Sequence, residues 1–257
     1  MSELPSTNKP RRSEWRKRVR RVAAALLCLA LAYHGLILFR VTRLRRADPA
    51  TTALMERRAA ESGERGVARR REFHWTPYER ISPNLVRAVL AGEDIRFFQH
   101  SGIDWVAVRV AFVHNLRERR LARGASAVNQ QLAKNLFLST SRNPLRKFHE
   151  ALLAVEMERI LGERRILELY LNVIEWGDGI YGAEAAARHY FNASASTLSA
   201  EQAAFLAAII PTPRANHHPS SPSDEIRGRI SRILPLMRHP WLNQPLLTAP
   251  PGAGDAP

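Results

Sequence analysis

The chain has 257 residues, which is enough for one catalytic domain and a short additional segment. Its net charge is +15 at pH 7, so we expect an acidic partner: nucleic acid, an anionic membrane surface or a phosphorylated substrate. The single cysteine, Cys28, lies in an apolar stretch near the N-terminus. This excludes an internal disulfide framework and leaves the rest of the chain without thiol or cysteine–metal chemistry.

The N-terminal region has the pattern of a membrane anchor. Residues 1–21 are polar and strongly basic, and we predict a disordered cytoplasmic tail there. The apolar stretch at 22–41 predicts one transmembrane helix, because it approaches the roughly 20 residues that a span needs and arginines flank it. The alternatives are a cleaved signal peptide and a buried core helix; the flanking arginines and the lack of a small-residue cleavage site favour the anchor. The N-terminal flank is the more basic one, which predicts the N-terminus inside and the large domain outside.

The rest of the chain divides into three regions. Residues 42–72 are rich in Ala, Glu and Arg and predict a helical or flexible connector that holds the domain away from the membrane. Residues 73–239 predict the folded domain, and the Pro/Gly/Ala-rich residues 240–257 predict a disordered tail. Helical spacing of apolar residues dominates the domain, and no run alternates as a strand would, so we predict a mainly α fold. The predicted helices are 83–101, 127–138, 144–161, 163–174, 181–190 and 200–210.

The first chemically informative stretch runs from Glu93 to Gly102. Ser82-Pro83 has the pattern of a capped helix start. If that helix continues to Gly102, then Glu93, Phe97 and His100 share one face. A carboxylate against an aromatic ring has a raised pKa, which suits a general base or acid. The alternative is a surface glutamate beside core aromatics, and for a glutamate taken alone that is the more common case.

The second stretch reads as a loop that enters a helix. Ser126 can cap the helix, and Gln131, Lys134 and Asn135 then lie near one face. These long donors suit sugar hydroxyls and phosphate oxygens. The alternative is a solvated polar helix face.

The third stretch begins at Asn143-Pro144, again a cap followed by proline. Arg146 and Glu150 lie one helical turn apart, which alone indicates an ion pair worth only about 0.3–0.5 kcal/mol. Arg142, Arg146 and Lys147 cluster at the start of the helix, where the helix dipole already favours anions.

A further segment, 103–123, is densely apolar and then arginine-rich. Two interpretations stay open here. The segment either lies in a membrane interface, as basic amphipathic segments do, or packs its apolar residues in the core and solvates its arginines.

Taken together and in order, these stretches resemble one family. Glu-Asp-x-x-Phe-x-x-His-x-Gly, Gln-Gln-x-x-Lys-Asn and Arg-Lys-x-x-Glu are similar to the first three motifs of the peptidoglycan glycosyltransferases, the transglycosylases that polymerise lipid II. The stretches 166–172 and 198–211 look like the fourth and fifth motifs. The lead-in at 75–85 is similar to that of the monofunctional type. The resemblance covers about 73–219 and implies a lysozyme-like glycosyltransferase domain.

The resemblance also implies roles for individual residues. Glu93 is expected to be the general base, and Glu150 the second catalytic glutamate and a candidate metal ligand. The expected substrate-binding residues are Asp94, Phe97, His100, Ser126, Gln130, Gln131, Lys134, Asn135, Arg142, Arg146 and Lys147. No cofactor is obligatory, with Mg²⁺ or Mn²⁺ as a candidate helper. The expected partners are lipid II, the growing glycan strand, the bacterial inner membrane, and transpeptidases or divisome proteins, but no nucleic acid, for which the chain has no recognisable motif.

The chain departs from the family pattern in the second motif. Ala125, Ala127 and Asn129 replace a glycine and two threonines, and Ala193 replaces a common lysine. These departures keep a second hypothesis open, a catalytically degenerate cell-wall scaffold tethered to the membrane. A third is a lysozyme-like hydrolase, which also uses two carboxylates.

Overall fold

The computed structural model describes residues 11–64, 71–118, 126–138 and 144–244. The chain divides into two compact units, Met1–Arg43 and Leu44–Pro257, and each is described by itself. Predictions that fall on Ala125, Arg142 or Asn143 lie outside the described residues.

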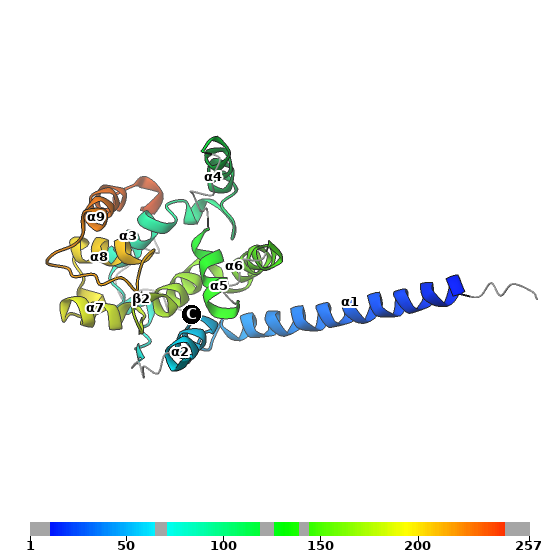
Figure 1. Cartoon of the computed structure of the whole chain (residues 1–257). Helices are drawn as coiled ribbons and strands as arrows, with labels where there is room; N and C mark the ends of the chain where they lie inside the picture. Colours follow the sequence, from blue (N-terminus) through cyan, green and yellow to red (C-terminus); the bar gives the residue numbers. More distant parts are fainter. Residues whose placement is uncertain (1–10, 65–70, 119–125, 139–143, 245–257) are drawn as a thin grey trace, which may run out of the picture. The chain divides into compact units, whose positions relative to one another are not determined.

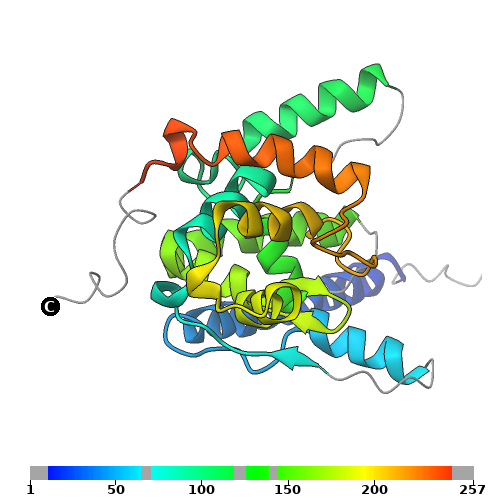
Figure 2. The ribbon, with the colours of Figure 1, turned by 90° about the vertical axis from the view of Figure 1, so that its left-hand side faces the viewer.

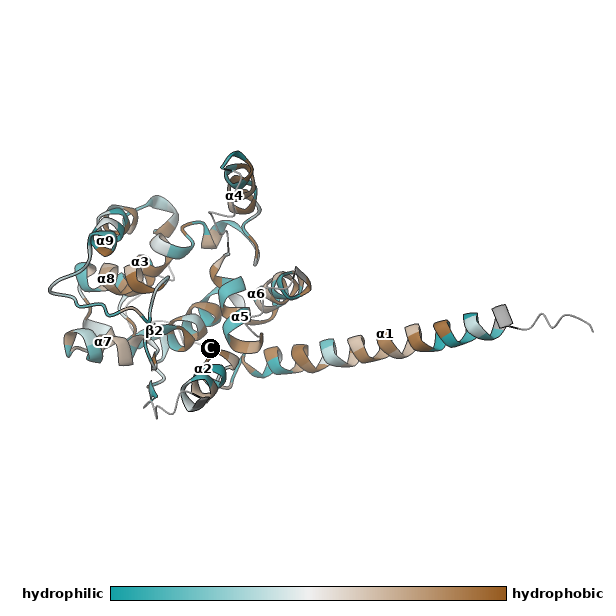
Figure 3. Ribbon diagram, in the orientation of Figure 1, coloured by the Kyte–Doolittle hydropathy of each residue, from teal (hydrophilic) through white to brown (hydrophobic). Residues whose placement is uncertain are grey.

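The first unit contains one long helix, α1 (Arg11–Arg43), which is long and apolar enough to cross a bilayer. Its apolar side chains, such as Leu26, Leu29 and Leu31, are exposed, and the hydrophobic stretch occupies the middle of the helix (Figure 3). The prediction of disorder for the whole of 1–21 is wrong for residues 11–21, which belong to this helix. Arginine and lysine are good helix formers, and Lys17 pairs with Glu14 at 2.9 Å one turn away.

The second unit is mainly α, as predicted. Its α-helices in the described ranges are α2 (Ala53–Glu64), α3 (Pro83–Glu93), α4 (Trp105–Arg117), α5 (Val128–Phe137), α6 (Pro144–Val173), α7 (Ala183–Phe191), α8 (Ala200–Ile209) and α9 (Asp224–Leu236). Short 3₁₀ turns occur at Tyr78–Arg80, Phe97–Gln99, Ala195–Thr197 and Pro240–Leu242.

A small sheet, which the sequence did not reveal, joins distant parts of the unit. Its strands β1 (Glu72–Phe73), β2 (Glu175–Gly177) and β3 (Ile180–Tyr181) have the order β1-β3-β2. β3 is parallel to β1 and antiparallel to β2. Strands of two or three residues are too short to show alternation, so periodicity could not predict them.

Two helical groups surround the core. In the first, α3, α8 and α9 pack side by side (Figures 1 and 2). α8 is alanine-rich and almost entirely buried, as expected for a helix that is apolar on all faces. In the second group α5 packs along α6, which is interrupted at Gly162, a residue with a positive φ of 74°. The predicted separation of two helical segments at Gly162 is therefore confirmed.

Two predicted helix caps are confirmed. The Ser82 hydroxyl accepts the Asn84 N–H at 3.3 Å, with Pro83 at the first helical position. Ser199 and Gln202 form the reciprocal capping box that opens α8, at 3.2 and 3.0 Å.

The predicted region boundaries need three corrections. The 42–72 connector is not a separate spacer, because α2 packs against α5 and Arg58 pairs with Glu175 at 3.0 Å. The tail is ordered through its first residues, since Leu242 is buried and Trp241 lies against the Arg96 guanidinium. The helix predicted over 83–101 ends at Glu93, because Asp94 leaves the helical conformation, with φ −160° and ψ 73°.

Gly102 lies where the turn after Phe97–Gln99 packs closely against the backbone of α6. Its φ is +81°, and an added Cβ would lie 2.8 Å from both the Ala154 carbonyl oxygen and the Val155 Cα. We expect Gly102→Ala to lower the free energy of unfolding by about 2 kcal/mol or more, through left-handed strain and overlap with backbone.

Gly228→Ala is the matched control. Gly228 lies inside α9 with open space where a Cβ would be, so alanine should stabilise the protein by about 0.5–1 kcal/mol. Thermal unfolding in detergent compares the two variants. Equal effects at the two positions would contradict this account of Gly102.

Candidate active site

A cleft of about 860 Å³ opens where α3 ends and α5 begins. Glu93 and Asp94 line it from the end of α3, and Ser126, Ala127 and Gln131 line it from the start of α5. α4 adds the apolar residues Val106, Ala107, Val110 and Ala111 to the lining. The cleft can therefore bind a molecule with both polar and apolar parts.

Glu93 is held at the cleft by a chain of hydrogen bonds. The Gln131 amide donates to the Glu93 carboxylate at 2.8 Å, and the Tyr170 hydroxyl donates to the Gln131 carbonyl oxygen at 2.9 Å. Tyr170 is fully buried, so it fixes which end of the Gln131 amide faces Glu93. Burial raises the pKa of Glu93 and Asp94 adds to the rise, while the Gln131 hydrogen bond, Arg229 and Lys134 oppose it. A half-buried carboxylate of this kind is suited to proton transfer.

Asp94 joins three segments. Its carboxylate accepts the Val128 N–H at 3.0 Å and lies 3.1 Å from the His100 Nε2. Val128 is the first residue of α5, so Asp94 satisfies a backbone donor that the helix itself leaves unpaired. The end of α3, the turn at His100 and the start of α5 are thereby fixed together.

Several predicted site residues support the cleft without lining it. Phe97 and His100 do not share a helical face with Glu93, because α3 has already ended. The Phe97 ring is buried, and its edge meets Phe98 at 5.1 Å. Gln130 is also buried, and its side chain accepts the Ala127 N–H at 3.2 Å. These three residues position the backbone around the cleft.

Glu150 is buried within a cationic cluster on α6. Arg146 reaches its carboxylate at 2.5 Å, and Lys147 also pairs with it. Lys147 in addition donates to the Ser126 hydroxyl at 2.8 Å, which links this cluster to the rim of the cleft. The predicted Arg146–Glu150 pair is therefore present, but in a buried site rather than on a solvated helix face.

The same contacts decide the fit of a metal ion at Glu150. Its carboxylate already has two cationic partners, so it does not offer an open ligand to a divalent cation. A second group of possible metal ligands in the described residues consists of Asp94, His100 and Asp104, whose ligand atoms all lie within 4.8 Å of one another. Asp94 holds Val128 and Asp104 caps α4 by accepting the Val106 and Ala107 N–H groups, so these carboxylates serve the fold. Mg²⁺ or Mn²⁺ dependence stays a prediction.

Lys134 and Asn135 lie one turn beyond Gln131 on the same side of α5, as predicted, and line a second, adjoining pocket. Burial lowers the pKa of Lys134, Glu150 opposes this effect, and the nearby Lys147, Arg146 and Arg57 lower the pKa further. Lys134 thus belongs to the cationic cluster around Glu150.

Comparison with known proteins shows which family this chain belongs to. The family model described as Transglycosylase matches residues 60–238. The chain belongs to the transglycosylase family. It is therefore an enzyme of the glycosyltransferase class. Among similar proteins, the biosynthetic peptidoglycan transglycosylase of Laribacter hongkongensis is 50% identical over 76% of this chain and 85% of its own length. Those of Nitrosomonas eutropha and Chromobacterium violaceum are 49% and 44% identical, over 74% and 82% of this chain and 78% and 92% of theirs.

The structure also places the unusual second-motif residues of this transglycosylase. Asn129 points away from the cleft: it is fully buried and its amide donates to Glu158 on α6. Ala127 lines the cleft and is the N-cap of α5, so the predicted cap at Ser126 is off by one residue. An alanine cannot accept a hydrogen bond from the helix, and Asp94 performs part of that task through Val128.

Sequence reasoning missed several residues that shape the transglycosylase site. Tyr170 lies in the fourth motif, among apolar residues at helical spacing. That spacing predicts a core position but does not indicate that the Tyr170 hydroxyl bonds to Gln131. Arg229 lines the cleft from α9, a helix that was not predicted. Arg57 and Arg58 line the second pocket from α2. Their only sequence signal was a locally basic composition.

A serine at position 127 would restore a conventional helix cap. We expect Ala127→Ser to raise the free energy of unfolding by about 1 kcal/mol, because its hydroxyl can accept the Gln130 N–H at the start of α5. Thermal unfolding measures the gain. Ala127→Val, which adds volume but no acceptor, serves as the control, and an equal gain from valine would argue against the capping explanation.

The raised pKa of Glu93 predicts a pH-dependent stability difference. Between the ordinary glutamate pKa of 4.5 and the raised value, the folded protein binds more protons at this site than the unfolded chain. The free energy of unfolding therefore falls as pH rises through that window. Glu93→Gln cannot ionise and escapes this loss, so its stability relative to wild type should be greater at pH 7 than at pH 4. Thermal unfolding at both pH values measures it; a pH-independent difference would contradict the raised pKa.

Proposed function

We propose that this transglycosylase polymerises lipid II into β-1,4-linked glycan strands and releases undecaprenyl pyrophosphate, as a step of peptidoglycan biosynthesis. The observation that carries the proposal is the half-buried Glu93 carboxylate, oriented by Gln131 beside a cluster of cations. The names of the relatives support the peptidoglycan substrate class. Cell-wall biogenesis and maintenance of cell shape would be the cellular roles.

Glu93 acts as the general base in this proposal. The attacking group is the sugar 4-hydroxyl of one lipid II, a weak nucleophile at neutral pH. The Glu93 carboxylate takes the hydroxyl proton as the oxygen bonds to the anomeric carbon of the donor strand, which typically contributes about 10²–10⁴-fold to the rate. The carboxylate must be ionised for this step, so its raised pKa places the acid limb of the pH–rate profile above the ordinary glutamate range.

The cationic cluster serves the leaving group. As the new bond forms, the bond from the anomeric carbon to the phosphate oxygen breaks, and the pyrophosphate leaves with the electron pair. Lys134, Arg146 and Lys147 supply positive charge to it, and Arg142 is the further cation predicted from the sequence. Glu150 holds Arg146 and Lys147 in place, so its role is to orient these cations. Attack opposite the leaving group inverts the anomeric carbon, from an α-linked donor to a β bond.

Membrane contact fits this substrate, because a lipid-linked sugar stays in the bilayer. α1 would be the anchor, with the N-terminus inside and the catalytic domain in the periplasm. The exposed apolar residues of α4, including Trp105, Phe112 and Leu116, support the interface interpretation of 103–123, since they are 70%, 67% and 68% exposed. Figure 3 shows this apolar character along α4.

The two other hypotheses have less support. A glycan hydrolase needs a second carboxylate free to act on water or sugar, whereas Glu150 is buried and paired with two cations. A degenerate scaffold is less well supported because Asn129 faces away from the cleft while Glu93 and Gln131 keep their hydrogen bond. Transpeptidases or divisome proteins stay predicted partners.

Lipid II polymerisation by the purified protein in detergent tests the proposal. We expect wild type to form glycan strands and Glu93→Gln to lose about 100-fold or more of the rate, since the amide cannot take a proton. Glu201→Gln, at an exposed glutamate of α8, is the matched control and should stay near wild type. No strands from well-folded wild type, with or without Mg²⁺, would favour the scaffold, and cleavage of finished glycan would favour the hydrolase.

A further inference from the structure

A second pocket, of about 210 Å³, adjoins the Glu93 cleft and is lined partly by α2. It shares Gln131 and Pro211 with the cleft, so the two spaces meet at these residues. Leu54, Arg57 and Arg58 come from α2, and Lys134 and Asn135 come from α5. A helix predicted as part of a mere connector therefore forms a wall of the space next to the candidate base.

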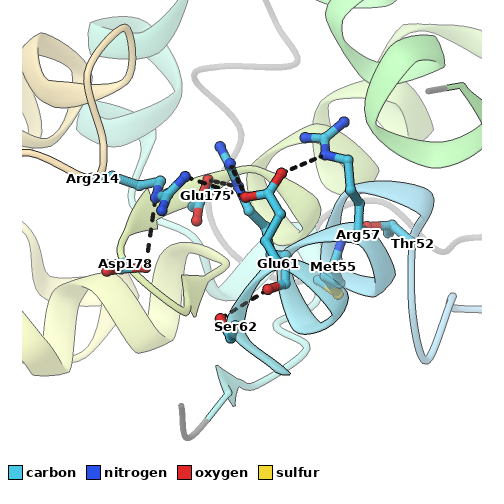
Figure 4. A network of polar contacts seen from close by, with 9 residues as sticks. Thr52, Met55, Arg57, Glu61, Ser62, Glu175, Asp178 and Arg214 are labelled. Atoms are coloured by element: carbon cyan, nitrogen blue, oxygen red, sulfur yellow. Dashed lines mark hydrogen bonds and ion pairs between the residues drawn. The ribbon is translucent and has the colours of Figure 1, made fainter. Parts of the chain in front are cut away.

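The arginines of this wall differ in how fully they are paired. Arg58 is held between Glu175 at 3.0 Å and Glu61 at 3.0 Å. Arg57 contacts Glu61 through Nε at a longer 3.3 Å, and Arg214 reaches the same carboxylate at 3.4 Å. One carboxylate thus serves three arginines, as Figure 4 shows in part with Arg57 and Arg214 reaching Glu61 from different sides. The guanidinium of Arg57 retains unshared donors toward the pocket among the residues described.

Lys134 faces the same pocket from α5. Within the described part of the chain, no side chain hydrogen-bonds to its ammonium, and the group is only partly exposed. Burial and three nearby cations, Lys147, Arg146 and Arg57, lower the pKa of Lys134, while Glu150 raises it. The pocket is lined by the cations Arg57, Arg58 and Lys134 and by one carboxylate, Glu175, which pairs with Arg58. Cations therefore outnumber carboxylates in the lining, an arrangement that a bound anion would stabilise.

We propose that Arg57 of α2 binds a phosphate group of the lipid-linked substrate, beside Lys134 of α5, to which the proposed function already assigns the leaving pyrophosphate. The inference rests on the proposed function and deepens it, because it makes α2 part of the substrate site rather than a spacer. Arg57 is 23% exposed in its side chain, so it can touch a ligand in the pocket while its stem stays in the wall. A guanidinium and an ammonium together match the oxygens of a phosphate.

The direct test is titration of inorganic pyrophosphate into the full-length protein in a nonionic detergent, followed by calorimetry. We expect Arg57→Ala to weaken binding about tenfold or more, Arg57→Lys to weaken it less, and higher salt to weaken wild-type binding. Arg232→Ala is the matched control, because Arg232 is an exposed arginine of α9 that lines neither pocket. Equal affinity of wild type and Arg57→Ala would overturn the inference.

Three further measurements distinguish a phosphate contact of Arg57 from a purely structural role and from binding of lipid headgroups. Thermal unfolding of Arg57→Ala shows whether α2 stays folded; Glu61 keeps Arg58 and Arg214, so we expect little change. Steady-state polymerisation by Arg57→Ala should show a raised KM for lipid II, with kcat changed less than by Glu93→Gln.

Sedimentation with phosphatidylglycerol vesicles tests whether Arg57 instead binds the phosphate of a bilayer headgroup. Loss of vesicle binding without loss of pyrophosphate binding would assign Arg57 to bilayer headgroups and overturn the substrate assignment.

The pyrophosphate titration does not depend on turnover, so this inference and the proposed function can fail separately. A protein that polymerises lipid II but binds pyrophosphate equally well without Arg57 would refute the inference alone. A protein that binds pyrophosphate through Arg57 but makes no strands would refute the polymerase alone.

Discussion

The geometry of the site depends on one buried carboxylate. Asp94 follows the last residue of α3 and accepts the first backbone N–H of α5, and the His100 Nε2 lies 3.1 Å from both of its carboxylate oxygens. This single contact sets the distance between two helices that are separated by a long stretch of sequence. Because Glu93 and Gln131 lie directly beside the two ends that Asp94 joins, their hydrogen bond follows from it. A buried carboxylate without these donors would cost free energy, so burial of Asp94 itself favours the arrangement in which Val128 and His100 lie against it.

The site separates two kinds of electrostatic environment. Around Glu93, burial outweighs the favourable contacts and the neutral acid is stabilised. Around Lys134 and Glu150, cations from different helices accumulate beyond the carboxylates that can pair with them. Gln131 stands between the two, as a neutral amide that lines both pockets. The Gln131 hydrogen bond lowers the pKa of Glu93 without cancelling the effect of burial. A cationic residue at this place would favour the ionised carboxylate more strongly.

The sequence was most informative where a local rule applied. Proline after serine marked the start of α3, the Ser199–Gln202 pair marked the start of α8, and Gly162 marked the break in α6. It was least informative where the outcome depended on contacts between distant residues. The apolar spacing after Glu93 continued to favour a helix, but the bonds from Asp94 to Val128 and His100 are stronger than that preference. The predicted face shared by Glu93, Phe97 and His100 was therefore wrong, although all three residues do lie in or under the site.

The segment 44–52, between α1 and α2, has little freedom of its own. Arg165 of α6 donates to the carbonyl oxygens of Leu44 and Ala47 at 2.7 and 3.0 Å, and it pairs with Asp48 at 2.8 Å. These contacts hold the backbone of 44–48 against α6, the helix that carries Glu150. One guanidinium makes all three contacts, so this segment of the second unit is held against α6 through a single side chain.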